Sequence, residues 1–233
     1  MKIAITGEKG FVGIHLMNYF RHILKYEVIE LGRDYLSKLS DLKELDWLIH
    51  GAFLHRSSDP NEILEENRKL AIATIDGLKN IKNKVNVVFL SSIQEDLETP
   101  YGIAKRESKE LFKRYCLEVD SNFVSYKLPN IFGRYAKPYK TSFVATFCYN
   151  IHNDLEIQHN KNLVKLNYID NVVAIIGTLE QNEITYTEIS VEEVYLKLVE
   201  FRNAVNLNKF PVINNELELH LFQTYLDYTN YKI

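Results

Sequence analysis

A tyrosine and a lysine stand four residues apart in the segment Tyr101-Gly102-Ile103-Ala104-Lys105. On a helix this spacing places both side chains on one face and within reach of each other. A nearby ammonium favours the phenolate and lowers the phenol pKa from its usual value near ~10. Tyr101 is therefore a candidate acid that protonates a carbonyl oxygen as hydride reaches the carbon. Ser92 ends the preceding predicted strand, where its hydroxyl would hold the same oxygen. The spacing also occurs in helices without catalytic roles, so the interpretation depends on the rest of the chain.

A glycine-rich turn, Thr6-Gly7-Glu8-Lys9-Gly10-Phe11-Val12-Gly13, follows a short apolar strand at the start of the chain. An amphipathic helix begins near Phe11. Glycines in this arrangement permit the tight turn, the approach of a pyrophosphate to the backbone and close packing of helix on strand. The helix N-terminus favours the negative charge of the pyrophosphate. The turn predicts a dinucleotide site formed by Gly7, Gly10, Phe11, Val12 and Gly13.

Alternating strand and helix patterns position these residues. We predict strands over residues 2–6, 26–31, 47–53, 85–90, 122–128, 164–168 and 184–189, and helices over residues 11–24, 60–80, 100–119, 141–152, 170–180, 191–205 and 216–228. The stretch 32–45 is too short for a full strand–helix unit. Alternation of this kind indicates an α/β fold, a Rossmann-like doubly wound parallel sheet. We expect a single domain over 1–233, with a dinucleotide-binding core over about 1–128 and a small substrate-binding lobe over about 129–233.

Composition narrows the class of protein. Of 233 residues, 46% are hydrophobic and 25% charged, as is typical of soluble globular domains. A net charge of −3 offers no electrostatic support for binding nucleic acid. No apolar run approaches the ~20 residues that span a bilayer, and no signal segment precedes the first strand. The two cysteines lie in no pairing motif, and the seven histidines lack metal-ligand spacing. We expect a cytoplasmic protein without a metal, a membrane or a nucleic acid as partner.

The motifs TGEKGFVG, LSS, YGIAK and LPNIFG together resemble those of the extended short-chain dehydrogenase/reductase family, also called the NAD-dependent epimerase/dehydratase family. Members mostly act on nucleotide-linked sugars. The resemblance implies that Tyr101 is the acid/base and Lys105 its electrostatic and ribose-binding partner. It also implies that Ser92, rather than Ser91, holds the substrate oxygen, and that Asn130 turns toward the substrate diphosphate.

Three further positions match the cofactor site of this family. Ala52 and Phe53 correspond to the strand-end backbone that passes under the cofactor, and Asn67 to a supporting asparagine on the following helix. Arg134 follows Asn130 and would meet a diphosphate through charge-assisted bonds, unless it belongs to a solvated basic loop. His55 lies beyond the strand end, where it would line the substrate site or remain a surface residue.

Longer segments, among them SSIQEDLETPYGIAK and LPNIFGRYAKP, resemble the reductase domain of bacterial capsular-polysaccharide enzymes in UDP-N-acetyl-L-fucosamine synthesis. This resemblance implies reduction of a 4-keto UDP-N-acetylhexosamine. Such enzymes carry a further cupin-type domain that epimerises the sugar. The chain ends where that domain would begin, so a separate cupin-type epimerase is an expected partner. The apolar final helix packs on the body of the domain or forms a homodimer interface.

The end of the second predicted strand bears on the cofactor. NAD sites place an acidic residue there, whereas an arginine accommodates the 2′-phosphate of NADP. The family's acidic position falls on Gly32, and Arg33 follows it, which favours NADPH over NADH or NAD. Glu30 or Asp34 takes the acidic part if the strand register differs.

The two residues that directly follow Ser92 bear on the type of reaction. Dehydratases of the family carry an Asp-Glu pair there, and this chain has Ile93 and Gln94, which do no acid/base work. Reduction of a 4-keto nucleotide sugar is therefore the leading hypothesis. A nucleotide-sugar epimerase with tightly bound NAD, and a non-catalytic nucleotide-binding partner of a separate epimerase, are the alternatives.

Overall fold

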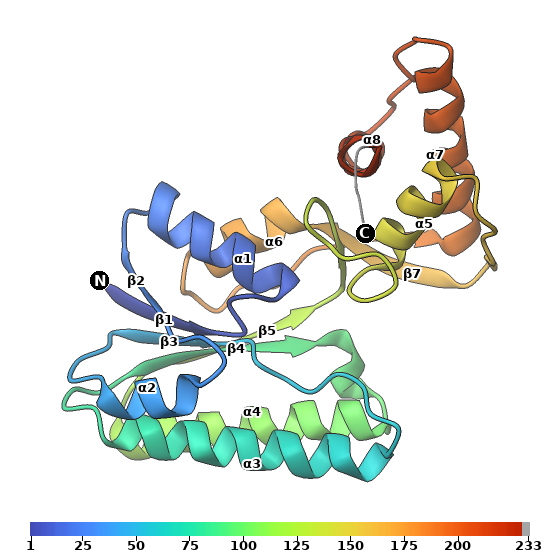
Figure 1. The fold of residues 1–233 in the computed structure, drawn as a ribbon. Helices are drawn as coiled ribbons and strands as arrows, with labels where there is room; N and C mark the ends of the chain where they lie inside the picture. The colour runs from blue at the N-terminus through green and yellow to red at the C-terminus, as the bar shows by residue number, and fades with distance from the viewer. Residues whose placement is uncertain (230–233) are drawn as a thin grey trace. The chain divides into compact units, whose positions relative to one another are not determined.

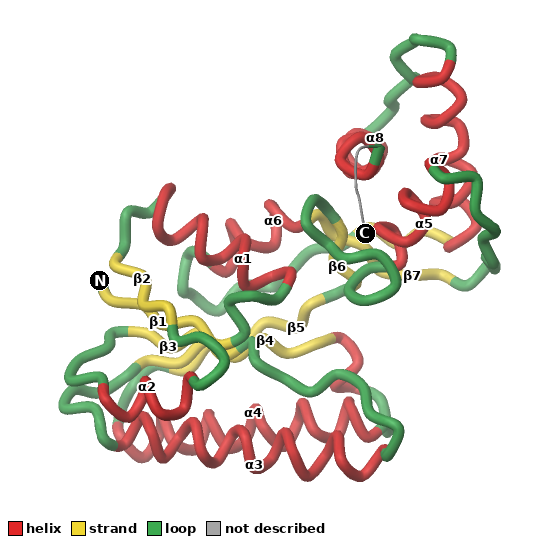
Figure 2. The backbone as a smooth tube through the Cα atoms, viewed as in Figure 1, coloured by secondary structure: helices red, strands yellow, loops and turns green. Residues whose placement is uncertain are grey.

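The computed structural model describes residues 1–229, which form two compact units (Figures 1 and 2). The first unit contains Met1–Leu128 together with Val173–Ile184. The second contains Pro129–Val172 and, among the described residues, 185–229. The sequence did not predict that a segment from the second half of the chain belongs to the first unit. The expected organisation as a single domain with a lobe stays a prediction.

A five-stranded parallel sheet forms the centre of the first unit, in the order β2-β1-β3-β4-β5. Its strands are β1 (Lys2–Thr6), β2 (Glu27–Glu30), β3 (Trp47–His50), β4 (Asn86–Ser92) and β5 (Phe123–Leu128). The strand order reverses beside β1, since β2 and β3 pair with its two sides. In open α/β sheets, ligands bind at such a reversal, outside the carboxyl ends of the strands. The predicted Rossmann-like parallel sheet is confirmed.

Helices cover both faces of this sheet (Figure 1). One face carries α1 (Phe11–Asn18), which continues as the π-helical turn η1 (Tyr19–Ile23). The other face carries α2 (Tyr35–Asp41), α3 (Pro60–Lys79) and α4 (Pro100–Val119). Both long helices begin with a capping side chain followed by proline, Asp59 before α3 and Thr99 before α4. Proline suits the first helical position because its ring pre-sets the helical φ. The short α2 lies within residues 32–45, the stretch that is too short for a full strand–helix pair.

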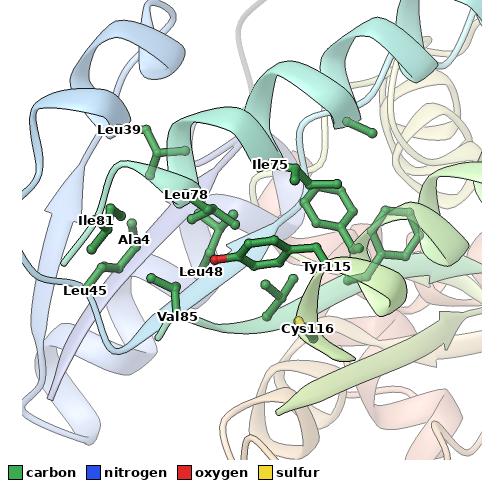
Figure 3. Packing of buried hydrophobic residues seen from close by; sticks show 14 of the residues in the cluster. Ala4, Leu39, Leu45, Leu48, Ile75, Leu78, Ile81, Val85, Tyr115 and Cys116 are labelled. Carbon is green, nitrogen blue, oxygen red and sulfur yellow. The ribbon is translucent and has the colours of Figure 1, made fainter. Parts of the chain in front are cut away.

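Apolar side chains fill the layer between the sheet and α3 and α4 (Figure 3). Leu48 of β3 and Val87 of β4 are fully buried there, and Ile75 and Leu78 of α3 lie against them. Tyr115 of α4 belongs to the same cluster. This packing fixes α3 and α4 against β3 and β4, and a catalytic site built on those elements requires such a rigid support.

The second unit contains a three-stranded sheet in the order β6-β7-β8, with β6 parallel and β8 antiparallel to β7. Its elements are β6 (Asn130–Phe132), α5 (Phe143–His152), β7 (Leu163–Tyr168), α6 (Ile169–Ile176), β8 (Thr187–Ser190), α7 (Val191–Asn206) and α8 (Glu216–Tyr228). α6 runs across the boundary between the units. The predicted capping box of Ser190 and Glu193 begins α7. In α8, Phe222 packs edge-on against Phe201 of α7, and the Tyr228 hydroxyl donates to the Ala136 carbonyl.

Some predicted boundaries are wrong, each for a local reason. The helix predicted to residue 180 ends at Ile176, because Leu179 has a φ of 57°, which a right-handed helix does not allow. The strand predicted from residue 184 begins at Thr187, since the Thr185 carbonyl accepts a bond from the Asn167 amide instead. Among residues 1–229, no helix is long and apolar enough to cross a membrane.

Candidate active site

The glycine turn fits a dinucleotide because side chains are excluded from it. Gly7 has a φ of 75°, and a Cβ there would lie 2.9 Å from the Ala52 nitrogen. A Cβ on Gly13 would lie 2.2 Å from the Gly7 carbonyl oxygen, and one on Gly10 3.0 Å from the same atom. No side chain caps the N-terminus of α1, whose backbone N–H groups begin at Phe11 and Val12. These donors and the close backbone packing suit a pyrophosphate.

The end of β3 is held beside this turn by Thr6. The Thr6 hydroxyl accepts bonds from the backbone N–H groups of Gly51 and Ala52, each at 3.1 Å. Its own proton is then free for Nδ1 of His50, 3.1 Å away. Burial, with a smaller effect of the Lys105 charge, lowers the pKa of His50 to about 3, so this ring is neutral. The sequence interpretation assigned no role in the site to the side chains of Thr6 and His50, the last residues of β1 and β3.

Asn67 of α3 holds the loop that leaves β3. Its side chain accepts a bond from the Leu54 N–H at 2.8 Å and donates to the carbonyls of Leu54, at 3.0 Å, and Ile63, at 2.7 Å. It is 1% exposed. The amide is therefore engaged with backbone, and Asn67 can influence a cofactor only by positioning the segment that contains Ala52 and Phe53.

Tyr101 and Ser92 lie together at the carboxyl edge of the sheet. Ser92 ends β4, and its hydroxyl accepts a bond from the Gln94 N–H at 3.2 Å. Tyr101 lies in the first turn of α4. Burial raises the pKa of Tyr101 to about 12, and a hydrogen bond with Ser92 opposes this rise. The expected lowering of this pKa by Lys105 is wrong, and the position of the lysine gives the reason.

Lys105 is buried at the base of the site. Its ammonium donates to the Leu90 carbonyl at 2.8 Å and lies 3.7 Å from the centre of the Phe53 ring. The centre of the Tyr101 ring is 5.7 Å away. Lys105 is 3% exposed, and this burial lowers its pKa to about 7, while the charge of Glu95 opposes the change. The lysine therefore titrates near neutrality and bonds to the strand rather than to the phenol oxygen.

Aromatic rings enclose the phenol of Tyr101. Phe53 meets it edge-on at a centroid distance of 5.5 Å and an interplanar angle of 81°. His55 stacks on it at 5.7 Å and 28°. Desolvation, followed by the charges of Lys105 and Arg56, lowers the pKa of His55 to about 4. His55 thus lies beside the candidate acid as a neutral ring, which supports the interpretation that it lines the site.

The turn after β2 presents two cations. Gly32 has a φ of 76°, and a Cβ there would lie 3.4 Å from Nζ of Lys38. Arg33 follows on the exposed side of the turn. Glu30, the acidic alternative, accepts a bond from Arg21 at 2.8 Å. The preference for NADP stays a prediction, and the Lys38 ammonium is an additional positive group that the sequence interpretation did not include.

Asn130 and Arg134 belong to the second unit, so their placement relative to Tyr101 stays a prediction. The Asn130 amide donates to the Lys165 carbonyl at 3.2 Å. Arg134 is exposed and lies 3.9 Å from the Asp170 carboxylate. Asp170 lies in the first turn of α6.

Ile93 and Gln94 lie in η2 (Ile93–Asp96), the short helical turn that follows Ser92. Neither side chain is ionisable, so neither can take a proton from a sugar carbon. The buried carboxylate of this turn belongs to Glu95, which accepts bonds from lysines of α4 and β5. Among the described residues, no group of three or more His, Cys, Asp or Glu side chains could hold a metal ion.

Comparison with known proteins shows the family of the chain. The chain is 29% identical over 98% of its length to a UDP-2-acetamido-2,6-beta-L-arabino-hexul-4-ose reductase of Pseudomonas aeruginosa, and spans 65% of that protein. The capsular polysaccharide assembling protein CapF of Staphylococcus aureus has 27% identity and a TM-score of 0.83 over the whole chain and 67% of CapF. A UDP-glucose 4-epimerase of Thermotoga maritima shares the fold, with 17% identity and a TM-score of 0.80 over 98% of both chains. A family model described as "NAD dependent epimerase/dehydratase family" matches residues 3–186, most of the chain. The protein therefore belongs to the NAD dependent epimerase/dehydratase family.

Proposed function

We propose that this protein catalyses the NADPH-dependent reduction of a 4-keto nucleotide sugar, of the class of UDP-linked N-acetylated deoxyhexuloses, in bacterial capsule or O-antigen precursor synthesis. The observation that carries the proposal is the position of the Tyr101 phenol beside Ser92, at the edge of the sheet where the glycine turn also lies. The likeness to a 4-keto-sugar reductase along almost the whole chain supports it. Membership of the family supports binding of NAD or NADP.

The residues of the first unit suit this reduction. The turn of Gly7, Gly10 and Gly13 and the start of α1 would hold the pyrophosphate of the cofactor, which supplies a hydride when bound. Ser92 would hold the carbonyl oxygen, and Tyr101 would donate its proton to that oxygen as the carbon gains hydride, so that the ketone becomes a secondary alcohol. The Ser92 hydroxyl would then stabilise the phenolate, and the ammonium of Lys105 would bind the ribose of the cofactor.

The raised pKa of Tyr101 bears on the direction of the reaction. With a pKa of about 12, the phenol is protonated at neutral pH. A protonated phenol is prepared to donate, which a reduction needs, whereas an oxidation needs a phenolate that accepts a proton. The raised pKa suits the donor role of Tyr101, and the likeness to a 4-keto-sugar reductase favours reduction over the alternative, an epimerase that first oxidises the sugar with tightly bound NAD. Recovery of stoichiometric NAD with the purified protein would support the epimerase.

Two positive groups support NADPH as the reductant. Arg33 is exposed after β2, and the Lys38 ammonium lies beside Gly32. Both would face the 2′-phosphate that distinguishes NADP from NAD.

We propose further that Asn130 and Arg134 bind the substrate diphosphate. A separate cupin-type protein would supply the epimerised substrate, and the protein would act in the cytoplasm, where NADPH is regenerated.

Tyr101→Phe tests the proposal. The variant should lose at least about 100-fold in turnover of a 4-keto UDP-sugar, the contribution expected of a positioned acid, and should bind NADPH as wild type does. Tyr115→Phe is the matched control, because it removes a buried phenol oxygen from the same helix within the core. Loss of NADPH absorbance reports turnover, and fluorescence titration reports binding. Full activity of Tyr101→Phe would refute the assignment.

A further inference from the structure

Glu95 is a buried carboxylate that the proposed chemistry does not use. It lies in η2, between β4 and α4, and is 2% exposed. The carboxylate accepts bonds from Nζ of Lys109 at 2.7 Å and from the Ser91 hydroxyl, and Nζ of Lys127 lies 3.1 Å away. Burial acts to raise the pKa of Glu95, but the bonds from Lys109, Ser91 and Lys127 outweigh it and hold that pKa below its usual range. Glu95 is therefore charged at neutral pH.

The partners of Glu95 belong to the elements that carry the proposed acid. Ser91 directly precedes Ser92 in β4. Lys109 lies on α4, one helical turn beyond Lys105, which is itself one turn beyond Tyr101. The backbone of η2 is also bonded to α4, because the Arg106 side chain donates to the Glu95 carbonyl at 2.6 Å. Glu95 thus ties the end of β4 to α4 without touching Ser92 or Tyr101.

Glu95 also acts on Lys105 through its charge. The titratable groups that face Lys105 are Tyr101 on the same helix, His50 at the end of β3 and His55 in the loop beyond it. Both rings are neutral at pH 7, and the phenol is protonated. Among the described residues, the charge that favours the ammonium of Lys105 against its burial is that of Glu95.

We propose that Glu95 is a positioning residue of this site, which fixes the Ser91–Ser92 end of β4 against the helix α4 that carries Tyr101 and Lys105. A buried ion pair is seldom the most stable choice, since a well-packed apolar group of similar volume often stabilises a fold as much or more. A role in stability alone therefore does not explain why this turn contains a carboxylate. The expected effect on turnover rests on the reductase function proposed above.

Glu95→Gln tests the inference, with Asp96→Asn as the matched control. Asp96 is the next residue and pairs with the same Lys127 at 2.8 Å, but it is 65% exposed. The pKa of Lys105 is read from 13C NMR of lysine-labelled protein, with Lys105→Arg to assign the signal. In Glu95→Gln this pKa should fall by about one unit, a tenfold change in the ammonium equilibrium, because an opposing negative charge is lost. Asp96→Asn should leave it unchanged.

Activity adds a second readout. The decline of kcat with rising pH should begin about one unit lower in Glu95→Gln, while the KM for NADPH stays close to that of wild type. A lower melting temperature with an unchanged Lys105 pKa would overturn the inference, because that result describes a structural role only. NMR requires no turnover. If the wild-type protein reduces no 4-keto sugar but the Lys105 pKa still falls in Glu95→Gln, the proposed function is refuted and the role of Glu95 toward Lys105 stands.

Glu95→Asp is the second variant, which tests the positioning role if Glu95→Gln does not fold. Aspartate retains the charge at a shorter reach, so Lys105 should keep its pKa while the bond to Ser91 is lost. We expect kcat to fall about tenfold in this variant, at an unchanged pH profile. A kcat equal to that of wild type would overturn the positioning role.

Discussion

Replacing Lys105 by methionine should raise the free energy of unfolding and lower the turnover. Its amine is 3% exposed, and burial lowers its pKa from 10.5 to about 7. The unfolded chain therefore binds this proton far more tightly than the folded protein does. A shift of this size corresponds to roughly 5 kcal/mol of unfavourable free energy in the folded state at neutral pH. Lys105→Met removes this cost and keeps most of the volume of the side chain.

One loss opposes the gain. The Leu90 carbonyl, which accepts from Lys105 at 2.8 Å, would be left without this donor. An unsatisfied buried acceptor costs about 1–3 kcal/mol. The variant should therefore be more stable than wild type by roughly 2–4 kcal/mol at neutral pH, and its turnover should fall at least about 100-fold.

The pH dependence gives the sharper test. Because the folded pKa is the lower one, the unfolded state holds more protons between about pH 7 and pH 10.5, and stability rises with pH in that window. Wild type should gain about 2 kcal/mol relative to Lys105→Met between about pH 7 and pH 9. Urea unfolding at the two pH values measures this difference. Lys113→Met, at an exposed position of the same helix, should change neither stability nor its pH dependence. A Lys105→Met protein that is less stable than wild type at pH 7, or whose difference is independent of pH, would refute the reasoning.

Two further substitutions test the cofactor site. Gly13→Ala places a Cβ 2.2 Å from the Gly7 carbonyl oxygen and should weaken NADPH binding at least about tenfold through displacement of the turn, as fluorescence titration would show. Its control is Gly77→Ala, whose Cβ would meet side chains alone, Leu39 at 3.2 Å and Ser40 at 3.6 Å. Equal binding by both variants would contradict the close-packing argument. Arg33→Ser should raise the KM for NADPH about tenfold and leave the KM for NADH unchanged, because the side chain is exposed and its charge would bind the 2′-phosphate. A parallel rise in both KM values would show that Arg33 has another role.

Local signals explain what the sequence predicted well. Thr99 and Pro100 mark the start of α4, and the predicted helix over 100–119 matches the observed bounds. Gly10 and Gly13 make their close contacts within the turn itself, so the spacing of the glycines indicated a dinucleotide site, whereas the alternation of strands and helices indicated the fold. Short elements escaped prediction: β6 has only three residues, too few for a periodic pattern.

Tertiary contacts explain what the sequence left open. The spacing of Tyr101 and Lys105 predicted a shared helix face, but the ammonium bonds to the Leu90 carbonyl, which only the packing of α4 on β4 brings near. The direction of the Tyr101 pKa follows from burial and not from spacing. Similarly, the sequence shows Glu95 only as an acidic residue in a polar turn. Its partner Lys127 is brought beside Ser91 by the pairing of β4 with β5.

Transfer of deuterium from 4-deuterated NADPH to a 4-keto UDP-N-acetylhexosamine tests the central claim most directly. Wild type should yield a UDP-sugar with deuterium at C4 and oxidise one NADPH for each sugar reduced. Tyr101→Phe, with the cofactor still bound, should yield almost none. An unlabelled epimerised sugar formed without net consumption of NADPH, or label transferred equally well by Tyr101→Phe, would contradict the account.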